Sequence, residues 1–267
     1  MKISIVVPTI GSPSPKIISE SLTSAINSEP SIWTQIIVID NSKGPHLSQL
    51  LQEFADKDPR IQIHKVAEQM NMAECWNCGL NLVKEDWVLF LHDDDILLSS
   101  NLDTSLLNRE DGFINFGFEV FENENWTYKL QHQGIEGIVT NTPKLVSTII
   151  NTQKLQSIGG WDSKSGYYLD FFAFIKLHSK FGSTASSKIL GRYRLHPLNA
   201  SAVSKRNQSY GDALPYVLAK IFEFVKDEQQ RRDILFSMIS FSYPNNTSSK
   251  KAISKLAKLT GNRAWLK

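Results

Sequence analysis

Four titratable residues follow one another at His92-Asp93-Asp94-Asp95, directly after the apolar run Trp87–Leu91. Carboxylates this close together repel one another and raise each other's pKa unless a cation lies among them. Mg²⁺ and Mn²⁺ prefer oxygen ligands, are often held by one or two carboxylates, and complete their coordination shell with substrate phosphates. The run therefore predicts a divalent-metal site beside a phosphate-bearing ligand. A solvated acidic turn that caps a helix over Ile96–Leu98 is the alternative.

The segments around this run indicate an α/β fold. Up to residue 91, apolar runs typical of buried strands alternate with segments of helical spacing. The predicted strands are 3–7, 35–39, 61–66 and 87–91, and the predicted helices are 16–28, 47–54 and 73–83. Such alternation predicts a mostly parallel sheet flanked by helices, with ligands bound at the carboxyl ends of the strands. Asp40 ends the second strand, so it is expected at the same edge as the acidic run.

The composition of the chain excludes several classes of protein. With 267 residues, 41% of them hydrophobic, the chain can bury a large core, and its formal net charge of +2 does not indicate a nucleic-acid partner. Residues 1–10 lack the features of a signal peptide, and no apolar run reaches the roughly 18 residues of a membrane-spanning helix, so we expect a cytoplasmic protein. Cys75 and Cys78 are predicted to be helix cysteines rather than metal or redox ligands.

The remainder of the chain has a less regular pattern. It predicts a strand over 113–120, a helix over 168–179, a helical segment over 210–240 and a polar linker over 240–249.

Several motifs, taken in order, resemble those of a family 2 glycosyltransferase with the GT-A fold. They are Ile5–Thr9, Val38–Ser42, Asn71, Asn77, Leu91–Asp95, Gly159–Asp162, Tyr168–Asp170 and Arg192–His196. The resemblance implies a Rossmann-like, mixed but mostly parallel sheet flanked by helices, with a C-terminal helical appendage. We expect a catalytic domain at 1–205, with a nucleotide-binding half at 1–110 and an acceptor half at 111–205, and a helical extension at 206–267.

The resemblance also implies roles for residues in the first half. Pro8, Thr9, Asp40, Asn71 and Asn77 are expected to contact the nucleotide. In the family's metal motif, His92 stands at the first acidic position and Asp94 closes the motif. We expect His92 and Asp93 to face the nucleotide, and Asp94, supported by Asp95, to bind Mn²⁺ or Mg²⁺. An alternative register, Asp93-x-Asp95, remains open.

Asp170 matches the position of the family's general base, although Leu169 replaces the acid that usually precedes it. A carboxylate there would accept the proton of an acceptor hydroxyl. The alternative is a first-turn helix acid favoured by the macrodipole. Arg194 is expected to face the diphosphate and His196 to join the metal site, unless the two lie on a basic edge strand.

The acceptor is expected to contact the Trp161-Asp162 pair, because an aromatic face packs against a sugar ring. A core position for Trp161 is equally compatible with the sequence.

Together these features predict an inverting, metal-dependent glycosyltransferase that moves a sugar from a nucleotide-diphosphate sugar, with UDP the expected nucleotide, to a glycan or lipid-linked acceptor. The resemblance implies a role in bacterial surface polysaccharide or lipopolysaccharide synthesis. A sugar nucleotidyltransferase is one alternative, but the loop Pro8–Pro13 has only one glycine where such enzymes need a glycine-rich loop. A catalytically inactive sugar-nucleotide-binding protein is the other, because His92 and Leu169 depart from the family pattern.

Residues 248–267 form a basic segment that contains no acidic residue. Its apolar residues fall near one face of a helix, which predicts peripheral contact with the inner face of the cytoplasmic membrane. The alternative is a helix end that packs on the catalytic domain.

Overall fold

The computed structural model describes residues 1–10, 14–44, 46–108, 110–128, 134–140, 142–197, 199 and 210–242. Its first half contains the parallel strands β1 (Ile3–Thr9), β2 (Trp33–Asp40), β3 (Ile61–Lys65) and β4 (Trp87–Phe90). The helices between them are α1 (Pro15–Ile26), α2 (His46–Ala55) and α3 (Met72–Leu82). The predicted alternation of strand and helix is confirmed here.

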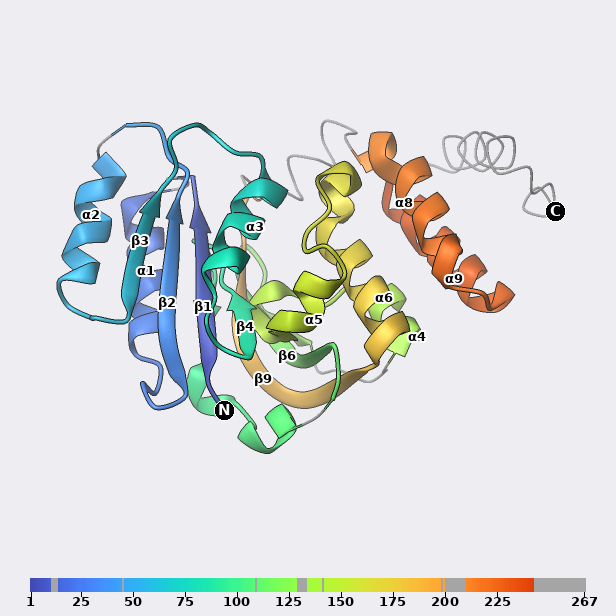
Figure 1. Cartoon of the computed structure of the whole chain (residues 1–267), viewed down its shortest axis with the longest axis horizontal. Helices are drawn as coiled ribbons and strands as arrows, with labels where there is room; N and C mark the ends of the chain where they lie inside the picture. The colour runs from blue at the N-terminus through green and yellow to red at the C-terminus, as the bar shows by residue number, and fades with distance from the viewer. Residues whose placement is uncertain are drawn as a thin grey trace.

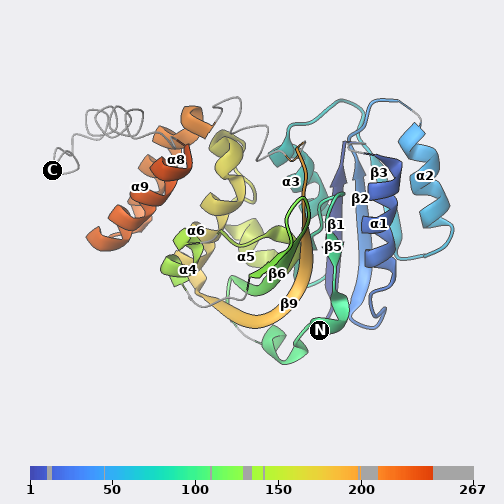
Figure 2. The ribbon, with the colours of Figure 1, turned by 180° about the vertical axis from the view of Figure 1, so that it is seen from behind.

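Both faces of this sheet are covered, which explains why its strands are apolar throughout. Figures 1 and 2 show α1 and α3 on opposite faces. Ile5 and Val7 pack into the cluster that contains α1 and α2, whereas Val6 packs into the cluster that contains α3. Successive side chains of a strand point to opposite faces, so each face receives its own set.

The second half extends the sheet with strands of mixed direction. These strands are β5 (Ile96–Leu97), β6 (Phe113–Glu122), β7 (Trp126–Tyr128), β8 (Thr148–Asn151) and β9 (Ser183–Leu195), and the sheet order is β3-β2-β1-β4-β8-β6-β9-β5 with β7 beside β6. Helices α4 (Gly134–Thr140), α5 (Thr152–Ser157) and α6 (Leu169–Phe181) accompany them. Short 3-10 helices lie at Ser99–Asn101 (η1), Thr104–Asn108 (η2), Leu145–Ser147 (η3) and Ser163–Tyr168 (η4).

The alternative prediction of a helix over Ile96–Leu98 is wrong, because Ile96 and Leu97 pair with β9 as the short antiparallel strand β5. The segment after the acidic run is therefore held by the sheet, and the run itself is a turn between two strands.

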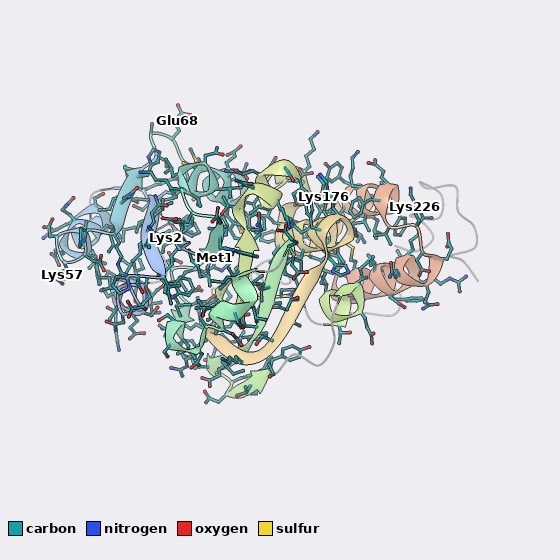
Figure 3. The ribbon with its side chains drawn as sticks, turned by 60° about the horizontal axis from the view of Figure 1, so that its bottom comes forward. Met1, Lys2, Lys57, Glu68, Lys176 and Lys226 are labelled. Carbon is teal, nitrogen blue, oxygen red and sulfur yellow. The ribbon has the colours of Figure 1, made fainter. Side chains whose placement is uncertain are left out.

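The helical segment predicted over 210–240 is two helices, α8 (Tyr210–Phe224) and α9 (Glu228–Ser242). Apolar side chains of both helices, such as Leu218 and Ile234, are fully buried in the cluster that contains α3 and α6. Figure 3 shows Lys57, near α2, and Lys226, between α8 and α9, at opposite ends of the molecule. None of the helices in the described part of the chain is long and apolar enough to cross a membrane. The basic segment 248–267, and all but the first residues of the predicted linker, lie outside the described residues.

Candidate active site

A cavity of about 1190 Å³ opens where β1, β2 and β4 end. Its walls come from both halves of the chain, since the loops after these strands face η3, η4 and α6 across it. It brings together most of the site residues that the sequence predicts: Pro8, Thr9, Asn71, His92, Asp93, Asp94, Asp95, Asp170 and His196 all line it. The acidic run therefore faces Asp170 across one cavity, although about 75 residues separate them in the sequence.

Three of these residues form a group that fits a metal ion. One potential ligand atom from each of His92, Asp94 and Asp95 lies within 4.8 Å of the others. The Nε2 atom of His92 is buried and has no hydrogen-bond partner among the described residues. Buried polar atoms normally have partners, so this nitrogen is available to a ligand. An imidazole with two carboxylates suits Mn²⁺ and comparable divalent ions.

The structure places His92 beside two carboxylates, whereas the sequence predicted a nucleotide contact for His92 and a metal contact for His196. The Nε2 atom of His196 lies beside the group, 3.0 Å from Asp94 Oδ2. The same oxygen accepts a hydrogen bond of 3.0 Å from the Asn199 amide. These two side chains orient Asp94, as residues behind a metal ligand commonly do.

The other aspartates of the run are held by backbone and side-chain donors. Asp95 Oδ1 accepts a hydrogen bond of 2.9 Å from the Arg194 backbone N–H. The Thr9 hydroxyl donates to Asp93 Oδ2 at 2.5 Å, which ties the end of β1 to the run. Burial raises the pKa of Asp93 to about 7 and raises that of Asp95 well above its usual value. A bound cation would favour the charged forms that burial disfavours.

Asp170 lies in the first turn of α6, and its Oδ1 atom accepts a hydrogen bond of 2.8 Å from the Phe171 backbone N–H. The N-cap of α6 is Tyr168, so Asp170 is an acid of the first turn that accepts from a backbone N–H at the helix start, and it also lines the cavity. Burial raises the pKa of Asp170, and the positive charge of Lys144 opposes that rise most strongly. A carboxylate whose pKa is moved toward neutrality is a stronger base, so the geometry is compatible with proton transfer as well as with a first-turn helix acid.

Two residues expected at the nucleotide are engaged within the fold. Asp40 is fully buried and accepts hydrogen bonds from the hydroxyls of Ser42 and Ser48. It also forms an ion pair of 3.0 Å with Lys65. Although burial raises the pKa of Asp40, these donors bring it below its usual value. Asn71 caps α3 in a reciprocal pair with Glu74 and still lines the cavity.

Five expected site residues do not line this cavity: Asp40, Asn77, Trp161, Asp162 and Arg194. The side chain of Asn77 pairs with the backbone N–H and carbonyl of Trp161, at 2.9 and 2.8 Å. Trp161 is only 1% exposed and meets Trp76 edge-on with ring centroids 5.0 Å apart, which makes it a core residue.

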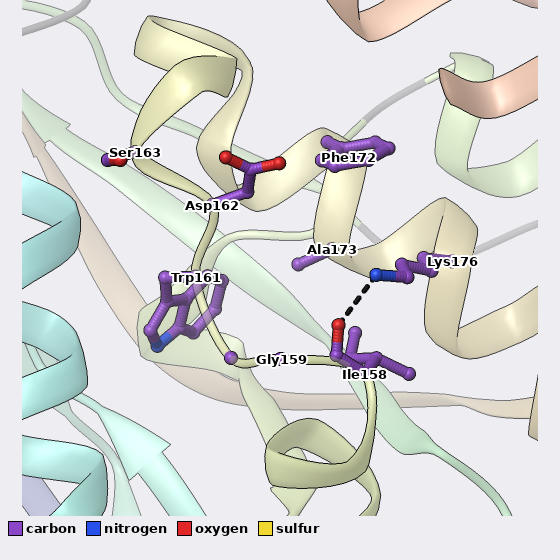
Figure 4. A pocket seen from close by; sticks show the side chains of 9 residues that line it. Ile158, Gly159, Trp161, Asp162, Ser163, Phe172, Ala173 and Lys176 are labelled. Carbon is purple, nitrogen blue, oxygen red and sulfur yellow. Dashed lines mark hydrogen bonds between the residues drawn. The ribbon is translucent and has the colours of Figure 1, made fainter.

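Asp162 and Arg194 are occupied by partners far away in the sequence. Asp162 accepts a hydrogen bond of 2.6 Å from the Tyr216 hydroxyl of α8. It lines a separate cavity of about 330 Å³, shown in Figure 4, where Lys176 donates to the Ile158 carbonyl. The guanidinium of Arg194 contacts Glu20, Glu122 and the Asp94 carbonyl, with a side chain only 3% exposed, so it has no face left for a phosphate.

A sequence profile described as "Glycosyl transferase family 2" matches residues 4–171, more than half of the chain. The chain belongs to this family. The match includes β1 to β4, the acidic run and Asp170, so it spans the residues that face the cavity from the sheet and from the start of α6. Most of α6, β9 and the helices α8 and α9 lie beyond it.

Individual relatives and solved structures agree with the family. An uncharacterized glycosyltransferase of Methanocaldococcus jannaschii is 27% identical over 126 residues, 46% of this chain and 43% of that protein. The O-antigen biosynthesis protein RfbC of Myxococcus xanthus is 31% identical over 78 residues, 29% of this chain and 6% of that protein. The aligned part thus spans less than half the length of each of these curated relatives.

Two solved structures share the GT-A fold of this chain. Residues 1–349 of TarS from S. aureus superpose with a TM-score of 0.75 at 14% identity, covering 97% of this chain and 80% of that one. The mannosyltransferase PcManGT of Pyrobaculum calidifontis, in complex with GDP-Man and Mn²⁺, gives a TM-score of 0.67 at 13% identity, covering 99% and 80%. At these identities the likeness shows the fold.

Two residues of this family 2 glycosyltransferase site were missed in the sequence. Asn199 follows His196 by three residues, and that spacing is the only signal that would have pointed to it. Lys144 belongs to no motif. It lines the cavity because the segment that precedes η3 forms part of the cavity wall. Contacts that depend on the arrangement of distant segments leave no local pattern.

Proposed function

We propose that this family 2 glycosyltransferase moves a sugar from a nucleoside-diphosphate donor to an acceptor hydroxyl with inversion at the anomeric carbon, and that Asp170 is the general base. The observation that carries the proposal is that Asp170 and the group His92, Asp94 and Asp95 line the same cavity. The cavity is large enough for a nucleotide sugar, since ligand sites typically have volumes of about 300–1,000 Å³.

In the proposed reaction, the Asp170 carboxylate accepts the proton of the acceptor hydroxyl as its oxygen bonds to the anomeric carbon. The bond from that carbon to the diphosphate breaks on the opposite face, so the configuration inverts. A divalent ion held by His92, Asp94 and Asp95 would offset the negative charge of the diphosphate. His196 and Asn199 hold Asp94 in place for this purpose.

For the donor we propose a UDP-sugar and for the biological role the synthesis of a surface polysaccharide or lipopolysaccharide on the cytoplasmic side of the membrane. Two facts support this choice. TarS, the neighbour of similar fold, has been solved in complex with UDP-GlcNAc. RfbC, a relative over part of its length, is named an O-antigen biosynthesis protein.

Incubation of the enzyme with UDP-sugars and Mn²⁺ tests the reaction class. A glycosyltransferase slowly hydrolyses its donor to UDP and free sugar, whereas an inactive binding protein leaves the donor intact. A second incubation, with UTP, a sugar 1-phosphate and a divalent ion, tests the nucleotidyltransferase alternative, because such an enzyme forms the UDP-sugar and releases pyrophosphate. The anomeric configuration of the released sugar or product, measured by NMR, reports inversion or retention. Pyrophosphate release in the second incubation would contradict the proposal.

The Asp170→Asn variant tests the base. It should bind donor as the parent does, yet transfer sugar about 100- to 10,000-fold more slowly, the usual range for loss of a general base. Because burial raises the pKa of Asp170 and the base must be deprotonated, the parent's kcat/KM should fall with decreasing pH at values above the ordinary aspartate pKa of 3.8.

Asp103→Asn, in an exposed turn between η1 and η2, is the matched control and should retain full activity. Transfer by Asp170→Asn within threefold of the parent would leave Asp170 only its role as an acid in the first turn of α6.

A further inference from the structure

The cavity carries more acidic than basic side chains. Among the described residues that line it, the acids are Asp93, Asp94, Asp95 and Asp170, and Lys144 is the only lysine or arginine. Like charges repel strongly where water is partly excluded, so a diphosphate can enter only if cations offset these carboxylates. A divalent ion offsets part of the charge. On the described part of the cavity wall, the protein itself supplies a lysine charge at Lys144.

The backbone of Lys144 is held firmly at the start of η3. Its carbonyl accepts hydrogen bonds from the Ser147 backbone N–H at 2.9 Å, the Ser147 hydroxyl at 3.1 Å and the Thr148 hydroxyl at 2.8 Å. The next residue, Leu145, is 4% exposed and anchors the segment in the core. The side chain of Lys144 therefore starts from a fixed point on the wall.

An aromatic ring directs the side chain itself. The ammonium of Lys144 lies 5.2 Å from the centroid of the Tyr193 ring, and Tyr193 also lines the cavity. An ammonium over the face of an aromatic ring is attracted by the ring's quadrupole. The charge of Lys144 therefore lies beside a residue of β9 that lines the cavity.

The charge of Lys144 acts on both the metal group and Asp170. Its charge lowers the pKa of Asp95, Asp170 and His92, in each case as a secondary contribution beside the effect of burial. A donor whose diphosphate contacts the metal group and whose sugar faces Asp170 would pass through this region. Lys144 lies within range of the negative charge that such a donor brings.

Two other cations near the site do not line the large cavity. Arg194 is enclosed by Glu20, Glu122 and the Asp94 carbonyl. Lys176 donates to the Ile158 carbonyl at 2.6 Å in the separate cavity of Figure 4.

We infer that Lys144 binds the diphosphate of the donor and supplies the phosphate contact that the sequence had assigned to Arg194. The inference rests on the proposed function, because it concerns the donor of that reaction. A charge-assisted hydrogen bond from an ammonium to phosphate is among the stronger polar contacts in proteins, so its loss should be readily measurable.

Titration calorimetry with Mn²⁺ alone, and with UDP and GDP in the presence of Mn²⁺, tests this role in Lys144→Met, Lys144→Arg and Lys176→Met. Lys144→Met should bind the nucleoside diphosphates about tenfold or more weakly. It should bind Mn²⁺ as tightly as the parent or more tightly, because a positive charge near the metal group is gone. Lys144→Arg should restore most of the nucleotide affinity, and Lys176→Met should match the parent.

Weaker nucleotide binding together with unchanged or tighter Mn²⁺ binding distinguishes loss of a phosphate contact from a folding defect. A folding defect would weaken the binding of both Mn²⁺ and nucleotide, and that result would contradict a specific phosphate contact. If Lys144→Met bound the nucleoside diphosphates within twofold of the parent's affinity, the inference would be wrong. A shift in the pH profile of transfer would not rescue it, because that shift would show only that Lys144 acts on Asp170. If the parent bound neither UDP nor GDP, the proposed function itself would be wrong.

Discussion

At the scale of single residues, Asp94 is the carboxylate of the acidic run best placed to hold the proposed metal ion. One of its oxygens accepts hydrogen bonds from His196 and Asn199, and its carboxylate lies within 4.8 Å of ligand atoms of His92 and Asp95. Burial raises the pKa of Asp93 and Asp95, and without a cation the charge of Asp94 raises both further. In the proposed metal site, this side chain would therefore favour metal binding at some expense of stability.

Asp94→Asn should weaken Mn²⁺ binding at least tenfold, because the ligand loses its charge while keeping an oxygen for His196 and Asn199. The thermal midpoint of the metal-free protein should stay the same or rise, since one source of carboxylate repulsion is removed. Calorimetric Mn²⁺ titration and thermal unfolding measure the two effects, with Asp103→Asn as control. Unchanged Mn²⁺ affinity would remove Asp94 from the metal site.

The sequence predicted where the acidic run lies but not which residues contact Arg194. The position of the acidic run after a buried strand was enough to predict its place at the sheet edge, because strand direction fixes where a strand's last residues lie. The partners of Arg194 were not predictable: Glu20 lies 174 residues away and Glu122 lies 72 residues away. A sequence shows that an arginine is charged, but not which carboxylates will enclose it.

At the scale of elements, Arg194 joins three parts of the fold to the acidic run. From β9 its guanidinium reaches Glu20 of α1 at 2.6 Å, Glu122 at the end of β6, and the Asp94 carbonyl at 2.7 Å. Glu122 has a φ of 80°, an uncommon conformation for a residue with a side chain, and its ion pair with Arg194 holds it there. The run is thus held in place from both halves of the sheet.

Arg194→Met should lower the free energy of unfolding by about 2 kcal/mol. Breaking a fully buried ion pair costs more, but Glu20 and Glu122 are partly exposed, which reduces the cost. Mn²⁺ binding should weaken as well, because the Asp94 carbonyl loses its donor. Arg192→Met is the matched control two residues away on β9, where both side chains of the pair with Glu119 are partly exposed, at 39% and 41%, against 3% for Arg194. Its cost should be below about 1 kcal/mol. Denaturant unfolding measures both values, and equal stability of the two variants would contradict the linking role of Arg194.

The elements that the sequence predicted least well are short or mixed in direction. β5 has two residues and β7 has three, too few for any period of apolar residues to be visible. The four parallel strands were predictable because burial on both faces makes them continuously apolar. The strands of the second half lack that uniformity, and their order in the sheet depends on pairing between distant segments.

At the scale of the whole molecule, α8 and α9 belong to the same core as the sheet. Leu214, Val217 and Ile221 of α8 are at most 1% exposed and pack in the cluster that contains α6. From α9, Ser237 and Met238 line the large cavity opposite the acidic run. The sequence predicted helices here from apolar spacing, but spacing alone does not show which surface a helix covers.

Residues 248–267 lie outside the described residues, and their sequence predicts peripheral contact with an anionic membrane surface. Six basic residues and no acids occur there: Lys250, Lys251, Lys255, Lys258, Arg263 and Lys267. Because the net charge of the chain is only +2, the rest of it is net acidic. Each basic residue near an anionic surface contributes on the order of 1 kcal/mol, and salt screens the attraction.

The full chain should co-sediment with vesicles that contain anionic lipid at low salt and dissociate at high salt, whereas a chain lacking residues 248–267 should remain in solution under both conditions. Vesicles of neutral lipid are the control for apolar adsorption, which salt does not weaken. A lipid-linked acceptor would make such attachment useful, since enzyme and substrate would meet on the same surface. Equal sedimentation of the two chains with anionic vesicles would show that membrane contact, if it occurs, belongs to the acidic remainder of the molecule and not to this segment.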